Sequence, residues 1–354
     1  MQTEVKKPTT LPKLNLPWVD SPFFETLLNQ CTLDETTKKQ VKHFADYGYL
    51  IIDPEIEDFE RLSAQIIHEL EPHYKGLGRI QDAWTINDAV KKLAIAPKIL
   101  SILRILYQRE PIPFQTLNFP KGTEQSTHSD TIHFHCVPAR FMCGVWVALE
   151  DIDRYNGPLH YYPGSHKLPI FDLNDLGLSG SSQSFPYEYY SLYEDLVQGL
   201  IGNGGFKKVD ISVKKGQALI WAANLFHGGS PILDRNRSRH SQVTHYYFSD
   251  CIYYTPLLSD PFLKRIYLKK IRNIITGEVV PHFYNGRLIV GEDEEGIINF
   301  NSTENEIDKL RFSLYKIKGE LENAQDFIKW VENSKFWKLR NQWFNLKKVL
   351  GLVK

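Results

Sequence analysis

The sequence predicts a mainly β protein with flanking helices, whose core is an antiparallel barrel or a double-sheet jelly roll. After Pro111, short runs rich in strand-forming residues alternate with Gly, Pro and Asn. Helical patterns precede these runs and would cover one sheet. Helical spacing returns near the C-terminus, where it predicts a separate helical tail. The strand-like runs are PFQTLNF, FMCGVWVAL, GPLHYYPGSH, KKVDISV, GQALIWAA and HSQVTHYYF.

The N-terminal segment divides into an arm and three helices. Residues 1–32 begin with a stretch rich in Pro, Lys and Thr and are expected to form an irregular arm. Helices are expected over about 33–47, 55–71 and 87–107. Gly48 should end the first helix before the strand-like residues 49–52, because glycine readily adopts the left-handed conformation of a helix end.

The barrel and its helices are assigned to residues 33–275, with one interruption. Residues 172–205 are rich in Gly, Ser and Tyr and break the strand rhythm. An insertion of this length is expected to be either a functional lid or a disordered loop. Residues 276–302 are then expected to be a linker.

Residues 303–354 are predicted to form a coiled-coil segment followed by a basic amphipathic helix. Apolar residues recur there at spacings of three and four, and the last 21 residues contain six basic and no acidic side chains. This pattern favours self-association, together with contact with anionic lipid headgroups or an acidic partner. The alternative is a helix that folds back onto the barrel. The coiled-coil seam consists of Ile307, Leu310, Leu314, Ile317, Leu321, Ala324, Ile328 and Val331.

The composition limits the class of protein. Of the 354 residues 42% are hydrophobic, and 42 basic side chains balance 42 acidic ones, so no net charge favours nucleic acid. The four cysteines form no CxxC pair, which is typical of a reducing compartment with free thiols. There is no secretory signal pattern and no uninterrupted apolar run of membrane-spanning length. A cytoplasmic protein is expected, in peripheral contact with the inner membrane face if the tail binds lipid.

The sharpest chemical feature is a His-x-Asp pair, His128 and Asp130, followed much later by His227. Two imidazoles and one carboxylate can occupy one face of an octahedral Fe(II) and leave three positions open. In extended chain, residues two apart point to the same side, so His128 and Asp130 could share one metal. A distant His227 would then supply the third ligand from another strand.

Other histidines compete for this role, namely His133, His135, His160, His166 and His245. If the extended conformation continued beyond Asp130, His133 and His135 would point to the face opposite the ligands. An isolated His-x-Asp pair is otherwise a weak signal, since most such pairs are surface or core residues.

Arg239, twelve residues beyond His227, is a candidate anchor for a diacid. A guanidinium binds a carboxylate through two parallel charge-assisted hydrogen bonds. Ser241 would lie on the same face of a strand. Arg235 and Arg237 are rivals, and all three arginines could instead lie on a solvated turn after Asp234.

With these residues in place, the sequence resembles the phytanoyl-CoA dioxygenase family of iron- and 2-oxoglutarate-dependent oxygenases. The resemblance covers roughly residues 40–250. It includes the THSD segment at His128, the LIWAANLFHGGS segment at His227, and the segments Gly157-Pro158-Leu159 and Pro163-Gly164-Ser165-His166 between them.

The resemblance implies a double-stranded β-helix core, Fe(II) held by His128, Asp130 and His227, and 2-oxoglutarate held by Arg239. It implies dioxygen as the second co-substrate and further cosubstrate contacts from Gln115, Asn118 and Lys121. His166 is expected to be a structural turn residue. Halogenating relatives have a small residue at the carboxylate position, so Asp130 disfavours that activity.

The expected function is therefore 2-oxoglutarate-dependent hydroxylation of a small or conjugated metabolite. The tail resembles those of bacterial glycosyltransferases and polysaccharide-assembly proteins, which favours a glycan, glycolipid or lipid substrate. Tyrosines in the insertion, Tyr187, Tyr189, Tyr190 and Tyr193, could line a lid that stacks on the substrate or could simply pack. The alternative function is a non-catalytic jelly-roll binding or scaffold protein that assembles through its helical tail.

Overall fold

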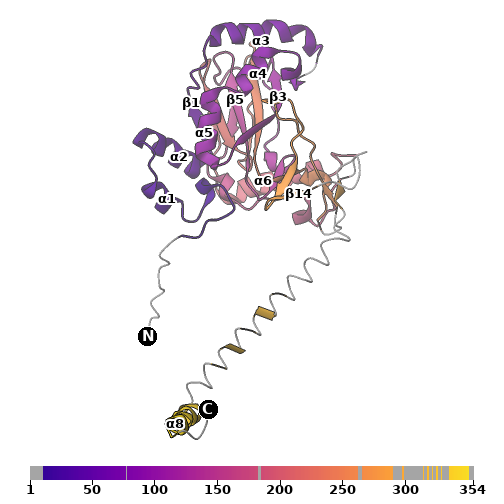
Figure 1. The fold of residues 1–354 in the computed structure, drawn as a ribbon. Helices are drawn as coiled ribbons and strands as arrows, with labels where there is room; N and C mark the ends of the chain where they lie inside the picture. The colour runs from indigo at the N-terminus through magenta and orange to yellow at the C-terminus, as the bar shows by residue number, and fades with distance from the viewer. Residues whose placement is uncertain are drawn as a thin grey trace. The chain divides into compact units, whose positions relative to one another are not determined.

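The computed structural model divides the chain into two units, Met1–Ile298 and Asn299–Lys354. It describes residues 11–76, 78–181, 185–261, 265–289 and 297–298, and then 314, 317–318, 321, 324–325, 328 and 335–350. Within the described residues, no helix is both long enough and apolar enough to cross a membrane. Figure 1 shows the ribbon of the chain.

The helices of the first unit begin and end at the residues that favour such boundaries. The Asp34 carboxylate accepts hydrogen bonds from two backbone amides at the start of α2 (Glu35–Tyr47), and Gly48 ends that helix with φ of 80°. The single helix expected over 87–107 is wrong. Two helices form there, because Pro97 disfavours helical backbone at the residue before it and starts a new helix instead. The other helices here are α1 (Phe24–Gln30), α3 (Phe59–Tyr74), α4 (Asp88–Ala94) and α5 (Pro97–Tyr107).

The irregular arm expected over residues 1–32 is also wrong for its second half. A 3-10 helix, η1 (Trp18–Asp20), and α1 place Trp18, Phe24 and Leu28 in the main hydrophobic core. The Trp18 indole donates a hydrogen bond to the Ile105 carbonyl of α5 at 2.8 Å. Apolar burial therefore orders a segment that its Pro-rich start predicted to be irregular. Residues 1–10 lie outside the described residues.

The main sheet has six antiparallel strands in the order β1-β8-β5-β10-β3-β2. Its inner strands are buried on both faces. Alternate residues of β5 pack in two different cores, with Val145 against the helices and Trp146 against the second sheet. The strands are β1 (Tyr49–Ile52), β2 (Ile80–Gln81), β3 (Pro111–Phe119), β5 (Met142–Ala148), β8 (Ala218–Ala222) and β10 (Ser241–Phe248).

Smaller antiparallel sheets form the second layer, in the orders β7-β6-β9 and β11-β4. The core between the layers contains Trp146, Trp221, Tyr161 and Ile211. The predicted combination of antiparallel sheets with flanking helices is therefore present, and Figure 1 shows α4 and α5 across the sheet beside β3 and β5. The strands of this layer are β4 (His135–Val137), β6 (Leu159–Tyr161), β7 (Val209–Ile211), β9 (His227–Gly229) and β11 (Ile252–Tyr254).

The insertion at 172–205 is mainly helical where it is described. The 3-10 helix η5 (Leu173–Leu176) and α6 (Tyr190–Gly204) pack through Leu173, Tyr193 and Val197 on a third apolar cluster. Residues 182–184 lie outside the described residues. The short 3-10 helices elsewhere are η2 (Ala83–Thr85), η3 (Asp130–Ile132), η4 (Ser165–Lys167) and η6 (Pro256–Leu258).

The linker expected over 276–302 is wrong in its described part. β13 (His282–Tyr284) pairs with β14 (Arg287–Ile289), and β12 (Ile266–Tyr267) pairs with β15 (Ile297–Ile298), so the first unit extends through this region. The Tyr253 amide also donates to His282 Nδ1 at 3.1 Å. Residues 290–296 and 299–302 lie outside the described residues.

The second unit contains α8 (Lys335–Val349). Five of the eight seam residues, Leu314, Ile317, Leu321, Ala324 and Ile328, are helical and exposed. Ile307, Leu310 and Val331 lie outside the described residues.

Candidate iron and 2-oxoglutarate site

The structure brings His128, Asp130 and His227 together as a buried cluster. One ligand atom from each lies within 4.8 Å of the others. Asp130 Oδ1 is 3.7 Å from Nε2 of His128 and 3.7 Å from Nε2 of His227. The two histidines are direct cross-strand neighbours, because the His128 amide donates to the His227 carbonyl at 2.9 Å and the His227 amide donates to the His128 carbonyl at 3.0 Å. Residues that are distant in sequence thus meet at one point.

The outer nitrogens of both imidazoles are fixed by the backbone. Nδ1 of His128 donates to the Ser126 carbonyl at 2.8 Å, and Nδ1 of His227 donates to the Leu225 carbonyl at 2.9 Å. Each bond selects the tautomer in which Nε2 is unprotonated, and in His128 this nitrogen also lies 3.3 Å from the side-chain amide nitrogen of Gln125. Burial, and then the neighbouring His227, lower the pKa of His128 to about 4. His128 is therefore neutral at pH 7, as a metal ligand must be.

The Asp130 carboxylate is oriented by Trp221, which sequence reasoning did not identify. The indole Nε1 donates to Asp130 Oδ2 at 2.8 Å, which leaves Oδ1 for the cluster. Burial opposes ionisation of Asp130, but His227, His245 and His128 outweigh it and keep its pKa below the usual value. Two imidazole nitrogens and one carboxylate oxygen on one side of a cavity fit a divalent iron with open positions.

Arg239 lies in the same cavity and is almost completely buried, with 1% of its surface exposed. Its Nη1 donates to the Gly157 carbonyl at 3.0 Å and its Nη2 to the Lys121 carbonyl at 3.5 Å. Its Nε is buried without a hydrogen-bond partner among the described residues. Burial lowers its pKa to about 10, so the guanidinium still has its charge at neutral pH. A buried cation with an unpaired donor fits the distal carboxylate of 2-oxoglutarate.

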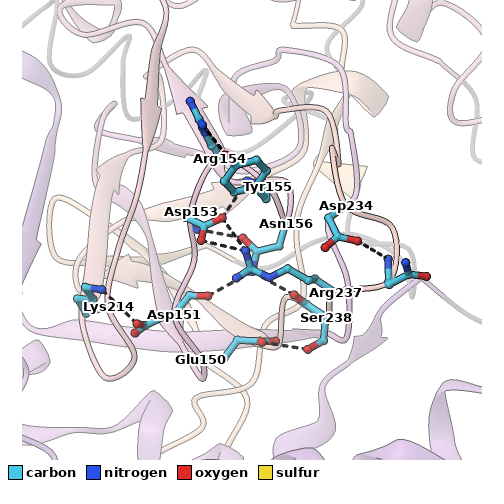
Figure 2. A network of polar contacts seen from close by, with 11 residues as sticks. Glu150, Asp151, Asp153, Arg154, Tyr155, Asn156, Lys214, Asp234, Arg237 and Ser238 are labelled. Carbon is cyan, nitrogen blue, oxygen red and sulfur yellow. Dashed lines mark hydrogen bonds and ion pairs between the residues drawn. The ribbon is translucent and has the colours of Figure 1, made fainter.

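The rival arginines are on the surface and already paired. Figure 2 shows Arg237 within a polar network, where its Nη1 lies 2.9 Å from both carboxylate oxygens of Asp153. Arg235 pairs with Glu124 at 3.2 Å. The solvated-turn interpretation therefore describes Arg235 and Arg237, while Arg239 turns inward.

The other expected cosubstrate residues have different positions. Gln115 lines the cavity, and its Oε1 accepts from His245 Nδ1 at 2.9 Å. Ser241 is buried and donates to the Arg239 carbonyl at 3.5 Å, without being among the residues that line the cavity. Asn118 bonds to Gln242 at 3.3 Å and likewise is not a lining residue. Lys121 is exposed and contributes its carbonyl oxygen to Arg239.

The competing histidines separate into cavity and structural residues. His133 lines the cavity, because the condition under which it would point away from the ligands, extended backbone beyond Asp130, is not met. The physical reason is η3, a 3-10 turn at Asp130–Ile132 that ends the extended backbone on which the alternation argument depended. His245 also lines the cavity, with Nε2 3.9 Å from Asp130 Oδ2.

His160 and His166 have structural contacts instead. His160 lies between Thr127 and Ser230, at 2.8 and 3.1 Å. His166 is buried and contacts the Ala45 carbonyl at 3.2 Å, as expected of a turn residue. His135 lies on β4 and is not among the lining residues.

The cavity has a volume of about 650 Å³ and reaches from the His-Asp-His cluster to the inserted segment. Tyr187 and Tyr190 of that segment line it, whereas Tyr193 is buried in the third apolar cluster and Tyr189 packs against the same cluster. The His133 ring stacks on Tyr190, with centroids 5.2 Å apart. Tyr187 and Tyr190 thus line the cavity, and Tyr190 also packs against the third apolar cluster.

Comparisons with known proteins agree with this geometry. The family model described as Phytanoyl-CoA dioxygenase (PhyH) matches residues 47–241, more than half of the chain. Phytanoyl-CoA dioxygenase domain-containing protein 1 of Mus musculus is 31% identical over 102 residues, which are 27% of this chain and 35% of that protein. The peroxisomal phytanoyl-CoA dioxygenase of Rattus norvegicus is 24% identical over 260 residues, which are 63% of this chain and 72% of that protein.

A solved structure shows the same fold. The non-heme alpha ketoglutarate dependent carbocyclase SnoK from nogalamycin biosynthesis superimposes with a TM-score of 0.52 and 18% identity, covering 66% of this chain and 90% of that chain.

Proposed function

Because the chain belongs to the phytanoyl-CoA dioxygenase family, we propose that it is an Fe(II)- and 2-oxoglutarate-dependent dioxygenase that hydroxylates a small or conjugated metabolite. The proposal rests on one observation. A buried His-Asp-His cluster and a buried arginine with an unpaired donor line the same cavity. A diacid that chelates a metal at one end and pairs with Arg239 at the other fits this arrangement.

Each residue then has a defined part. His128 and His227 would hold the iron through Nε2 and Asp130 through Oδ1, while Trp221 keeps the carboxylate in place. Arg239 would hold the distal carboxylate of 2-oxoglutarate. When bound, Fe(II) and 2-oxoglutarate supply, with dioxygen, the oxidation of a C–H bond coupled to release of succinate and carbon dioxide. Phe134, Trp146 and Trp221 are buried apolar side chains in the lining of the cavity.

For the substrate we propose a glycan, glycolipid or lipid. Support comes from the volume of the cavity and from the two lid tyrosines that line it, since tyrosine offers both apolar area and a polar tip to a sugar or acyl chain. The second candidate, a binding or scaffold protein without catalysis, has no use for an unpaired buried arginine beside a metal cluster.

Anaerobic addition of Fe(II) and 2-oxoglutarate tests the activity directly. The proposal requires a weak visible charge-transfer band and, in air, succinate release that increases when the substrate is present. Arg239→Met should weaken 2-oxoglutarate binding by about 10- to 100-fold, because a charge-assisted pair contributes about 1.5–3 kcal/mol. Arg237→Met is the matched control, since it removes a surface arginine only two residues away. Equal 2-oxoglutarate affinity in the two variants would support the binding protein instead.

We also propose that residues 303–354 mediate association with a second copy of the chain, with α8 in contact with an anionic lipid surface. Leu314, Ile317, Leu321 and Ile328 follow helical seam spacing, and each is more than half exposed. α8 contains five basic residues and no acidic one, and Trp343 and Leu346 are exposed on it. The same proposal includes peripheral attachment of the protein to the inner face of the membrane.

A further inference from the structure

With Fe(II) and 2-oxoglutarate bound, the described residues that line the cavity would still have an excess of positive charge. Among the described residues, its charged lining consists of three cations, Arg79, Arg239 and Lys269, and one carboxylate, Asp130. Fe(II) and Arg239 would together be balanced by Asp130 and the doubly charged 2-oxoglutarate. The positive charges of Arg79 and Lys269 then remain, in a cavity where charges interact more strongly than in water.

Lys269 is held in the cavity wall. Its amide donates to the Tyr253 carbonyl at 2.8 Å, and the adjacent Leu268 forms a bridge with Tyr254, so the backbone is fixed by β11. Its ammonium lies over the Phe134 ring, 4.7 Å from the centroid. The side chain is half-buried, and no acidic group of the described residues lies within ion-pair distance of it. Burial, opposed by the more distant Asp82, lowers its pKa to about 8.

Arg79 is exposed at the same cavity, in the segment that enters β2. It also has no ion pair with an acidic group in the described part of the chain. After burial, which is the main effect, the charges of Lys269 and Arg79 contribute to lowering the pKa of both His133 and His245. Both cations therefore act on the region where these two histidines lie.

This region is distinct from the 2-oxoglutarate anchor. The cavity is lined by Val243 and His245 on one face of β10, and by Arg239, which lies two residues before that strand. Six residues of extended chain separate Arg239 from His245, a distance of about 20 Å. His245 contacts Phe134, with ring centroids 4.9 Å apart, and Phe134 in turn contacts Lys269. The unpaired lysine is thus grouped with His245, far along the strand from Arg239.

We infer that the substrate is an anion, and that its carboxylate or phosphate group is received by Lys269 at the end of the cavity opposite Arg239, while Arg79 adds positive charge from the β2 edge. The inference rests on the proposed function, because it presumes that 2-oxoglutarate occupies Arg239. Tyr187 and Tyr190 would contact the uncharged body of the substrate between the anion and the metal. A half-buried ammonium without a described partner is stabilised by such an anion through a charge-assisted hydrogen bond.

Three probes of similar size test this inference: 3-phenylpropionate, phenyl phosphate and the neutral 3-phenylpropanamide. Each is titrated by calorimetry into anaerobic full-length protein that has first been saturated with Fe(II) and excess 2-oxoglutarate, as monitored by the visible band. At least one anion should bind about tenfold or more tightly than the amide, and the tighter anion identifies the group. If the visible band never forms, the proposed function fails before any probe is added.

Lys269→Met should remove the preference for the anion, whereas Lys270→Met, which changes an exposed neighbour outside the cavity, should preserve it. Equal binding of amide and anions by the unmodified protein would overturn the inference. So would a preference that survives in Lys269→Met, or failure of both anions to bind at millimolar concentration.

A measurement on the unmodified protein covers the case in which Lys269→Met does not fold. Acetylation by acetic anhydride, followed by peptide mass mapping, should proceed about fivefold more slowly at Lys269 when the tighter anion is present. Lys270 serves as the internal control and should react at the same rate with and without the probe. Equal slowing of both lysines, or of neither, would contradict an anion site at Lys269.

Discussion

Trp221 determines which oxygen of Asp130 is available to a metal. Its indole hydrogen bond to Oδ2 fixes the carboxylate plane, while backbone carbonyls fix both imidazoles. Partners of metal ligands typically contribute about 10- to 100-fold to metal affinity. Each of the three side chains in the cluster is thus oriented by a hydrogen bond to another residue.

Trp221→Phe should therefore lower Fe(II) affinity by about tenfold or more, because the ring remains and the donor is lost. Anaerobic metal titration measures the change. Trp84→Phe is the control, because the Trp84 Nε1 has no hydrogen-bond partner among the described residues. Unchanged affinity in Trp221→Phe would show that the backbone bonds alone orient the cluster.

Buried neutral histidines make the metal-free protein sensitive to acid. Burial is the main cause that lowers the pKa of His128, His135, His160, His166 and His245 to about 4 each. Between about pH 6.5 and 4 the unfolded chain binds protons that the folded chain does not. The contribution of these neutral histidines to the free energy of unfolding is therefore complete above about pH 6.5 and is lost as the pH falls toward 4.

The free energy of unfolding of chelator-treated protein should fall by about 1.4 kcal/mol per pH unit for each such histidine in this window. Urea denaturation at several pH values measures the slope. The His166→Gln variant, changed at a site remote from the proposed metal ligands, should show a pH dependence of the free energy of unfolding that is smaller by about 1.4 kcal/mol per pH unit. A free energy that is constant between pH 6.5 and 4.5 would contradict buried, neutral imidazoles.

At the residue scale, the sequence could predict which side chains lie together where a spacing has a geometric meaning. His128 and Asp130 are two apart in extended chain, and Arg239 lies on the approach to a strand that faces the cavity. His245, which the sequence analysis named only as a rival ligand, could have been assigned to the cavity in the same way, because it is an even number of residues from Arg239 along the same strand and its approach. Trp221 and Lys269 gave no such signal, because their contacts are made between strands that only the fold brings together.

At the scale of elements, the strands were easier to predict than the boundaries between helices. Strand signals in β3, β5, β8 and β10 are continuous apolar or alternating runs, and the structure has strands there. The helix expected over 87–107 is divided at Pro97, and the arm over 1–32 contains α1, because tertiary burial of Phe24 and Leu28 cannot be read from local composition. The strands in 276–302 escaped prediction because two- and three-residue strands have no detectable period.

Gly144 is required for the contact between β5 and β8. A Cβ at this position would lie 2.1 Å from the Trp221 ring, so Gly144→Ala must displace the indole that orients Asp130. We expect destabilisation by about 1–3 kcal/mol together with weaker Fe(II) binding. Urea denaturation and metal titration measure the two effects.

Gly199→Ala in α6 is the matched control for that variant. A Cβ there meets no atom within 4 Å, and alanine favours helix over glycine by about 0.5–1 kcal/mol. It should raise stability slightly and leave metal affinity unchanged. If Gly144→Ala behaved like Gly199→Ala, Trp221 would not be packed against β5.

At the scale of the whole molecule, the His-Asp-His cluster and the C-terminal tail belong to different units. All candidate ligands and cavity residues lie within Met1–Ile298, and the exposed seam lies within Asn299–Lys354. The two units can therefore be tested separately, since the cavity contains no described residue of the second unit.

Deletion of residues 303–354 should leave the Fe(II)–2-oxoglutarate band intact while lowering the oligomer mass, because the seam for a second copy is removed. Light scattering and sedimentation from liposomes containing anionic lipid measure the two tail properties. Ile317→Lys separates them, because a charge in the seam should lower the mass without affecting liposome binding. Unchanged mass and unchanged liposome binding after deletion would support a tail that folds back onto the first unit.

The reciprocal backbone hydrogen bonds between His128 and His227 have a consequence for how a metal ion binds to the site. Because backbone hydrogen bonds between paired strands hold the two imidazoles side by side, we expect the ion to bind without a folding transition. Stripping and reloading should then be reversible in ordinary buffer. A site of two imidazoles and one carboxylate also binds other divalent ions of similar size, so Zn²⁺ and Co²⁺ should compete with Fe(II). The ion bound in the cell should therefore depend on which metal is available there.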